Sequence, residues 1–245
     1  MPLSEASPTA DYAAAVEALA LRLLDALNRS AVSGTVADHV RDAADAKAAL
    51  AAVRVLGPDV FAPALLCSTA PGEGDLEVVD EALVVFPWVP GQQSEAACLA
   101  QATAALLARH GGRTTGMTSC GAEDAVHGFV AEGLPWRPWS QRMARLSPLA
   151  LPGVHPAVTT VACERSLDLA RGMTRALLRR DYPTAARLAR WVALAHSHSA
   201  AVDVNVSGVV RHLSLCGAVG ARMTLDLAII RHVIARSAAV GEDMP

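Results

Sequence analysis

The chain has 245 residues, of which 52% are hydrophobic and only 4% aromatic, and its formal net charge is −3. That length and hydrophobic content are enough for one large domain or two small ones with a buried core of alanine, leucine and valine. The five scattered cysteines never form a CxxC pair, the N-terminus lacks the basic region of a signal peptide, and no uncharged apolar run reaches the roughly 18 residues of a membrane span. We therefore expect a cytoplasmic protein without a disulfide framework, a zinc knuckle or a membrane contact.

The N-terminal part of the chain is predicted to be mostly helical. Apolar residues at three- and four-residue spacing indicate an amphipathic helix over 10–29, and a second helix is expected over 35–54 with Thr35 as its cap. Prolines interrupt the next stretch, so we expect irregular structure there, with one short element over 76–86 that is either helix or strand. A further helix is predicted over 93–110, and Gly111 and Gly112 are expected to end it.

The C-terminal part has a clearer helical pattern. Helices are predicted over 120–132, over 158–180, from 184 onward and over 223–238. Residues 134–157 hold five prolines together with Trp136 and Trp139, so this segment is expected to dock on the rest of the protein. The predicted fold class is therefore mainly α, a bundle of about seven to nine helices, and a minor strand near 76–86 or 202–207 stays open.

Charge divides the chain into two halves of opposite sign. Residues 1–132 hold 17 acidic and 7 basic side chains, whereas residues 133–245 hold 7 acidic and 14 basic ones. We interpret 1–132 as an acidic helical half, 133–157 as the docked connection and 158–245 as a basic helical bundle, packed together as one globular unit. Opposite charges favour docking of the halves on each other or on a second copy of the chain, and an anionic ligand on the basic half is an alternative.

Residues 195–217 gather histidines, an aspartate, an asparagine and a cysteine in an apolar neighbourhood. On a single helix, His198, Asn205 and His212 would lie together on the flank of a buried valine face. His198 and His212 would be about 21 Å apart along that helix, so they could not share an ion, and we predict no metal and no cofactor. The alternation of VDVNVS over 202–207 would instead fit a strand.

The stretch TSCGAEDAVH is a second place where chemistry could occur. Cys120 would lie near a helix N-terminus, where the helix dipole favours a thiolate, and His127 would share a helix face with Asp124. One hypothesis is a nucleophilic cysteine with an imidazole nearby. The structural alternative is that Ser119 caps the helix and the acidic residues interact with its N-terminal dipole.

An arginine row follows in the basic half. Arg171, Arg175 and Arg179 recur at four-residue spacing, and Arg187 and Arg190 continue the row. Guanidinium groups in such a row can bind phosphate or carboxylate groups bidentately, whereas the structural alternative is a solvated helix face that pairs with acidic residues nearby. Nucleic acid is not expected, because aromatic residues hardly interleave with these arginines and the whole chain is acidic.

No Gly-rich phosphate loop, GxSxG elbow or HExxH motif occurs in the chain. We therefore predict a helical interaction or assembly protein that binds a protein partner or itself without catalysis. The alternative is an enzyme that modifies a small molecule in a pocket between the halves. Its candidate residues are catalytic Cys120, His127, His198 and His212, and ligand-binding Arg137, Asn205, Arg171, Arg175 and Arg179.

Overall fold

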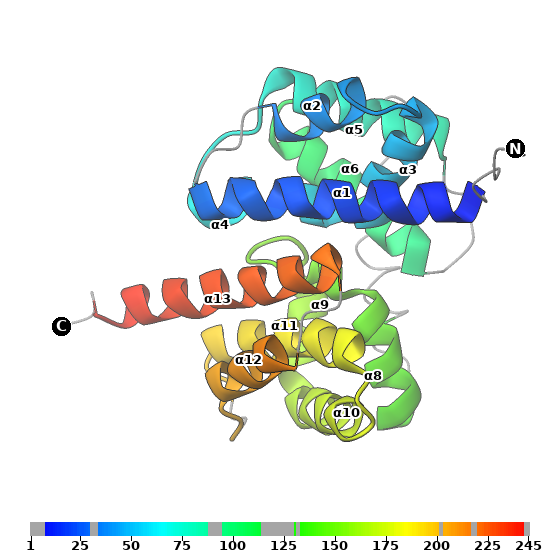
Figure 1. Ribbon diagram of the computed structural model, residues 1–245. Helices are drawn as coiled ribbons and strands as arrows, with labels where there is room; N and C mark the ends of the chain where they lie inside the picture. Colours follow the sequence, from blue (N-terminus) through cyan, green and yellow to red (C-terminus); the bar gives the residue numbers. More distant parts are fainter. Residues whose placement is uncertain are drawn as a thin grey trace, which may run out of the picture.

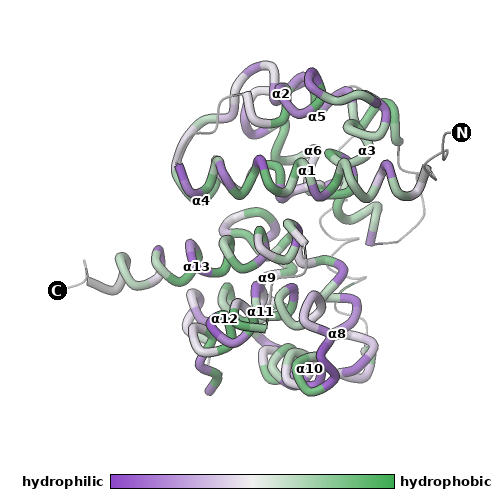
Figure 2. The backbone as a smooth tube through the Cα atoms, in the orientation of Figure 1, coloured by the Kyte–Doolittle hydropathy of each residue, from purple (hydrophilic) through white to green (hydrophobic). Residues whose placement is uncertain are grey.

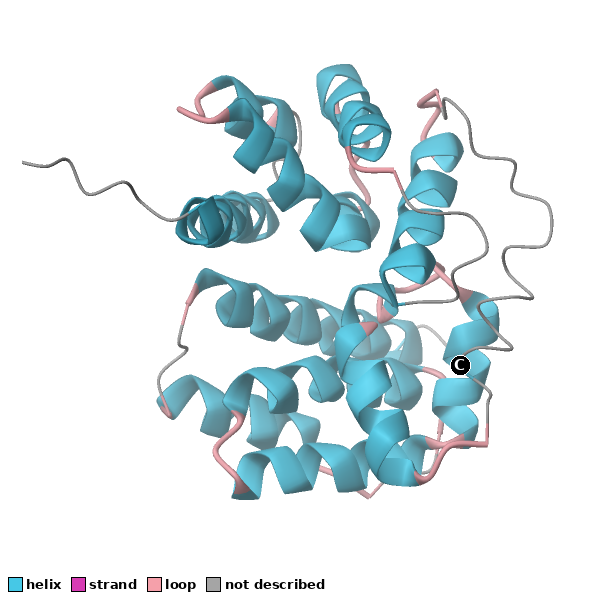
Figure 3. Ribbon diagram, turned by 90° about the vertical axis from the view of Figure 1, so that its right-hand side faces the viewer, coloured by secondary structure: helices cyan, strands magenta, loops and turns pink. Residues whose placement is uncertain are grey.

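The computed structural model describes residues 8–29, 34–87, 95–113, 130, 133–200, 203–216 and 220–242. These residues form helices and loops and contain no strand (Figure 3). The mainly α fold class is confirmed, and the described residues hold more helices than the seven to nine predicted.

Two layers of helices make up the molecule (Figure 1). The first layer contains α1 (Pro8–Arg29), α2 (Thr35–Arg41), α3 (Ala46–Leu56), the 3-10 helix η1 (Gly57–Phe61), α4 (Ala62–Cys67), α5 (Glu73–Val85) and α6 (Glu95–Arg109). The second contains α8 (Trp136–Arg145), the 3-10 helix η2 (Ser147–Leu149), α9 (Pro156–Glu164), α10 (Ser166–Leu178), α11 (Tyr182–Ser197), α12 (Val206–Leu215) and α13 (Ala221–Glu242). The layers meet chiefly where α1 lies beside α13.

Two tryptophans fix the interior of the second layer. Trp139 and Trp191 are both fully buried. The indole nitrogen of Trp139 donates to the Val130 carbonyl at 2.9 Å, and that of Trp191 donates to the Met143 carbonyl at 2.8 Å. A buried indole needs such a partner, because an unpaired N–H in an apolar core is costly. Residues 134–157 are thus packed into the protein, and they contain α8 and η2.

Several predicted helices are interrupted in the structure. Residues 35–54 form α2 and α3 with a break at 42–45, where the Asp45 side chain accepts hydrogen bonds from the amides of Lys47 and Ala48 and so begins α3. The prediction of Thr35 as a cap is wrong, because Thr35 is the first residue of α2 and Asp75 of α5 caps this helix from outside. A second interruption, at Arg165, separates α9 from α10.

The strand alternatives are also wrong. Residues 76–85 lie within α5, in which Glu77 and Glu81 are exposed while Val79 and Ala82 are buried. Described residues 203–205 form neither strand nor helix.

The single helix considered for 195–217 does not exist. The α11 helix ends at Ser197, Ser199 adopts a left-handed backbone with φ 60°, and α12 begins at Val206. The amide of Ala200 donates to the Ala195 carbonyl at 3.0 Å, which closes the end of α11. Asn205 then caps α12, because its side-chain oxygen accepts the Gly208 amide at 2.8 Å.

Candidate functional site

An open groove of about 490 Å³ runs between α8 and α10. One lining residue comes from α8 and the others from α10 and its C-terminal cap, and together they combine apolar with cationic side chains: Trp136, Leu167, Ala170, Arg171, Thr174, Arg175, Leu178 and Arg179. Leu167 and Leu178 are 58% and 81% exposed, which is unusual for leucines and marks an apolar strip without a cover. The groove therefore offers hydrophobic contact and positive charge side by side.

Close packing of α8 on α10 positions this groove. A Cβ atom added to Gly172 of α10 would lie 2.5 Å from the Cβ of Ser140 on α8, so only glycine allows the helices to approach this closely. Arg165 precedes α10 and stacks over the ring of Trp139 with 4.2 Å between its Cζ and the ring centroid. It also donates to the Leu134 carbonyl at 2.9 Å. These contacts hold both walls of the groove in place.

The three arginines of the groove differ in their partners. Arg171 lies 3.4 Å from Asp168, a long contact to a carboxylate that Arg165 already binds at 2.9 Å. Arg175 and Arg179 are exposed, and within the described residues no carboxylate pairs with either of them. Within the described residues, only Arg171 of the row therefore has a carboxylate partner.

Trp136 forms the wall that α8 contributes, and Arg137 lies beside it. Trp136 is half-buried and lines the groove, and the Cζ of exposed Arg137 lies 5.2 Å from the centroid of its ring. Four of the ligand-binding candidates of the sequence thus lie in or beside one groove: Arg137, Arg171, Arg175 and Arg179. Asn205 does not belong with them, because its side chain caps α12.

The candidate catalytic residues lie elsewhere. His198 is exposed at the end of α11, and His212 is exposed on α12. The Nε2 atom of His212 lies 3.4 Å from the Sγ of Cys216, and its ring meets that of Tyr182 edge-on at 6.4 Å. A hydrogen bond with Cys216 raises the pKa of Tyr182. The other two candidates, Cys120 and His127, lie outside the described residues.

These positions do not form a common pocket in the described part of the chain. Neither His198, Asn205 nor His212 lines the α8–α10 groove or the second groove described below. Among the residues that the structure describes, no group of three or more histidine, cysteine, aspartate or glutamate side chains is arranged to hold a metal ion. Of the candidates that the structure describes, His198, Asn205 and His212 thus do not converge with the arginines in one groove.

A buried ion network that no sequence motif indicated joins the two layers. Arg190 of α11 is fully buried and donates to both carboxylate oxygens of Asp59 on η1, at 2.6 and 3.0 Å. It also donates to Asp226 of α13 at 2.8 Å, and Arg222 donates to Asp59 at 2.6 Å. The interpretation of Arg190 as a continuation of the exposed row is wrong, because its charge is met inside the protein.

The charges of this network keep Asp59 ionised. Burial by itself opposes ionisation, but the charges and hydrogen bonds of Arg190 and Arg222 outweigh it and lower the pKa of Asp59. Burial likewise disfavours the charged form of Arg190, and Asp59 and Asp226 overcome this and raise its pKa. The signal in the sequence was a charged residue inside each of the apolar runs LARWVALA, GPDVFAP and TLDLAII.

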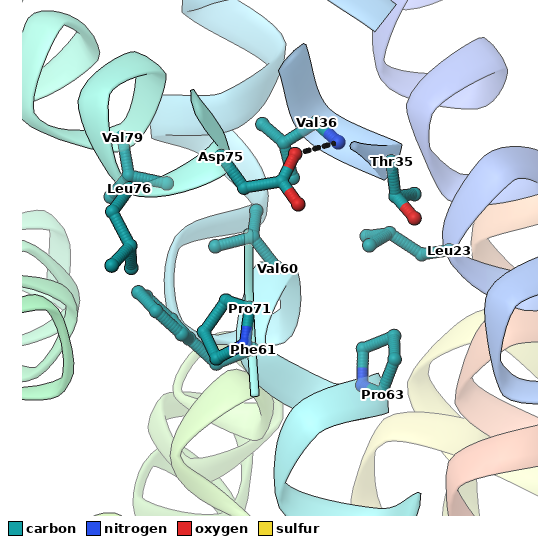
Figure 4. Close-up of a pocket in the computed structure, with 10 residues that line it drawn as sticks. All are labelled: Leu23, Thr35, Val36, Val60, Phe61, Pro63, Pro71, Asp75, Leu76 and Val79. Carbon is teal, nitrogen blue, oxygen red and sulfur yellow. Dashed lines mark hydrogen bonds between the residues drawn. The ribbon is translucent and has the colours of Figure 1, made fainter. Parts of the chain in front are cut away.

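Two further hollows are weaker candidates. A groove of about 450 Å³ between α12 and α13 is lined by two arginines, of which Arg231 already donates to Ser214 at 2.8 Å. Figure 4 shows a small cavity at the start of α2, where Asp75 faces Val36. Its volume of about 10 Å³ holds no more than about one water molecule, and the Asp75 carboxylate is used by the amides of Gly34, Val36 and Ala37.

One segment, Ala46–Cys67, is long and apolar enough to cross a membrane by length and composition alone. Within its most apolar window, 72% is buried inside the protein, as in a core helix of a packed fold.

No protein-family model, curated protein or solved structure matches the chain.

Proposed function

We propose that this protein is a non-catalytic interaction protein whose α8–α10 groove binds an acidic, amphipathic helix of a protein partner. The observation that carries the proposal is that Arg175 and Arg179, which pair with no carboxylate of the described residues, lie beside the exposed leucines of the same helix. A partner helix with carboxylates along one edge and apolar residues beside them would satisfy both.

The charge pattern supports a helical partner more than a small anion. On a helix, residues four apart are separated by about 6 Å of axial rise, so the row from Arg171 to Arg179 extends over about 12 Å. A single phosphate or carboxylate would engage one end of that row. A helix with carboxylates at the same four-residue spacing would engage all of it.

The setting we propose is the cytoplasm. The four described cysteines, Cys67, Cys98, Cys163 and Cys216, are free thiols, as is usual in a reducing compartment.

A labelled peptide tests the proposal directly. The probe is a designed helix with glutamates at four-residue spacing and leucines on the adjoining face, and its matched control has glutamine in place of every glutamate. Fluorescence anisotropy should show binding of the acidic probe that weakens with salt. Binding should be about two- to thirtyfold weaker for Arg175→Glu, since each exposed ion pair contributes about 0.2–1 kcal/mol and the reversal replaces that attraction by a repulsion of similar size. The control reversal Arg211→Glu, on the α12–α13 groove, should bind like the wild type.

Two results would contradict the proposal. Equal binding of the acidic and glutamine probes would show that the arginines are not used. Displacement of the probe by inorganic phosphate alone, at an ionic strength matched with sodium chloride, would indicate a small-anion site.

A further inference from the structure

The outer face of α5 carries the charge pattern that the α8–α10 groove requires. Glu73, Glu77 and Glu81 are exposed and recur at four-residue spacing. In the part of the chain that the structure describes, no arginine, lysine or histidine forms an ion pair with any of them. The helix ends in exposed Val84 and Val85, which are 54% and 43% accessible, so the acidic row adjoins an uncovered apolar pair.

The rows on α5 and α10 have the same spacing. Each contains three like charges four residues apart, so the charges in both rows are separated by about 6 Å along the axis. If the two helices lie antiparallel, all three charge pairs and one apolar pair fall into register at once. The opposed residues are then Glu73 with Arg179, Glu77 with Arg175, Glu81 with Arg171, and Val85 with Leu167.

The two helices cannot meet within one molecule. In Figure 1, α5 lies at the top of the first layer and α10 at the bottom of the second. The main contacts of α5 are with α2, α3 and α6, whereas those of α10 are with α8, α9 and α11. Figure 2 shows hydrophilic stretches at both of these ends, around α2 and α5 and around α8 and α10. The complementary surfaces are therefore presented outward, at opposite ends.

We propose that the occupant of the α8–α10 groove is α5 of a second copy of this chain. This inference rests on the proposed function, because it names the acidic helix that the groove binds. The two surfaces are different, so the contact is head to tail: each copy offers its groove to one neighbour and its α5 to another. Such heterologous contacts produce open chains of molecules rather than a closed dimer unless the rotation between copies closes a ring.

The contact is expected to be weak and dependent on concentration and salt. One helix laid on one groove gives a small interface, and exposed ion pairs are screened as ionic strength rises. Oligomers should therefore grow with protein concentration at low salt and dissociate at high salt.

Charge reversal with rescue tests the inference in sedimentation-velocity experiments on the full chain. The groove variant is Arg171→Glu with Arg175→Glu and Arg179→Glu, and the helix variant is Glu73→Arg with Glu77→Arg and Glu81→Arg. Each should be monomeric alone, because both of its surfaces carry the same sign. An equimolar mixture should associate again, because each groove then meets an α5 of opposite charge. Circular dichroism checks that each variant is folded, and the single reversals Arg175→Glu and Glu77→Arg serve if a triple variant is not.

Three results would overturn the inference. In the first, the wild type stays monomeric at low salt and high concentration. In the second, the wild type associates and neither the groove variant nor the helix variant weakens that association. In the third, the equimolar mixture of the two variants stays monomeric. If the acidic probe still binds in an Arg175-dependent manner in any of these cases, the proposed function stands and only the choice of occupant is wrong. If neither the probe nor a second copy binds, both fail.

Discussion

The buried network and the exposed groove use the same side chain in two different ways. Arg190 is enclosed by the carboxylates of Asp59 and Asp226 and ties η1, α11 and α13 together across the two layers. Arg175 and Arg179 lie on the neighbouring helix α10 with no carboxylate of the described residues against them. An arginine whose charge is met inside the fold serves the structure, whereas an arginine whose charge is left unmet beside exposed leucines can serve binding. The comparison predicts that changes in the network affect stability and that changes in the groove affect association.

The largest effect on stability is expected for Asp59→Asn. The substitution removes the carboxylate that Arg190 and Arg222 share and leaves Asp226 as the one carboxylate bound to Arg190 among the described residues; breaking a buried ion pair in this way costs about 3–5 kcal/mol. Urea denaturation measures this loss. The control is Asp25→Asn, which removes an exposed pair with Arg29 and should change the unfolding free energy by less than about 1 kcal/mol. Equal losses for the two variants would refute the role given to the network.

Acid should weaken the wild type through the same residue. Because the pKa of Asp59 is lower in the folded protein than its ordinary value of 3.8, its stabilising effect is complete well above pH 4 and disappears as the pH falls through the folded pKa. The difference in unfolding free energy between the wild type and Asp59→Asn should therefore shrink between pH 5 and pH 3. Denaturation at a series of pH values tests this, and a difference that does not change with pH would contradict it.

An intermediate effect is expected for Gly172→Val, which acts on the groove through its packing. The new side chain would enter the space of Ser140 on α8, and overpacking of this kind costs about 1–3 kcal/mol. Thermal unfolding should show the loss, and binding of the acidic probe should weaken with it. Gly133→Val is the matched control, since a Cβ at that position meets nothing within 4 Å. Similar melting temperatures for the two variants would show that α8 and α10 are not in close contact.

A smaller loss of stability is expected for a substitution at Asn205, and almost none for one at His198. Removal of the cap in Asn205→Ala should cost about 1 kcal/mol, because the Gly208 amide loses its acceptor. His198→Ala removes an exposed side chain and should stay within about 0.5 kcal/mol of the wild type. Urea denaturation of both variants measures the two losses of unfolding free energy. A larger loss for His198→Ala than for Asn205→Ala would contradict the roles given to these residues.

The sequence was informative where the structure is determined locally. The helices predicted over 10–29, 93–110 and 223–238 agree closely with α1, α6 and α13, because apolar spacing and end signals lie within each segment. The break at 198–205 was not predicted, because it depends on the left-handed Ser199 and on the Asn205 cap. Periodicity could not decide between helix and strand for 76–86, where packing on α2, α3 and α6 makes α5 a helix.

The candidate sites, too, were predictable where they depend on one segment and not where they depend on distant residues. The spacing of Arg171, Arg175 and Arg179 was visible in the sequence, but the groove beside them needs Trp136 from another helix. The buried network was not visible as a unit, since Asp59 and Arg190 are 131 residues apart in the chain. No local sequence pattern predicts the close approach of Gly172 to Ser140 or the contact between η1 and α11.

The central claim is that the α8–α10 groove is the binding surface, and mapping by nuclear magnetic resonance tests it most directly. Titration of ¹⁵N-labelled protein with the acidic helical probe should shift the indole signal of Trp136 and the amide signals of α10, while the buried indoles of Trp139 and Trp191 stay in place. The shifts should be absent with the glutamine probe. Shifts that map to the α12–α13 groove, or a spectrum unchanged by the acidic probe, would contradict the account.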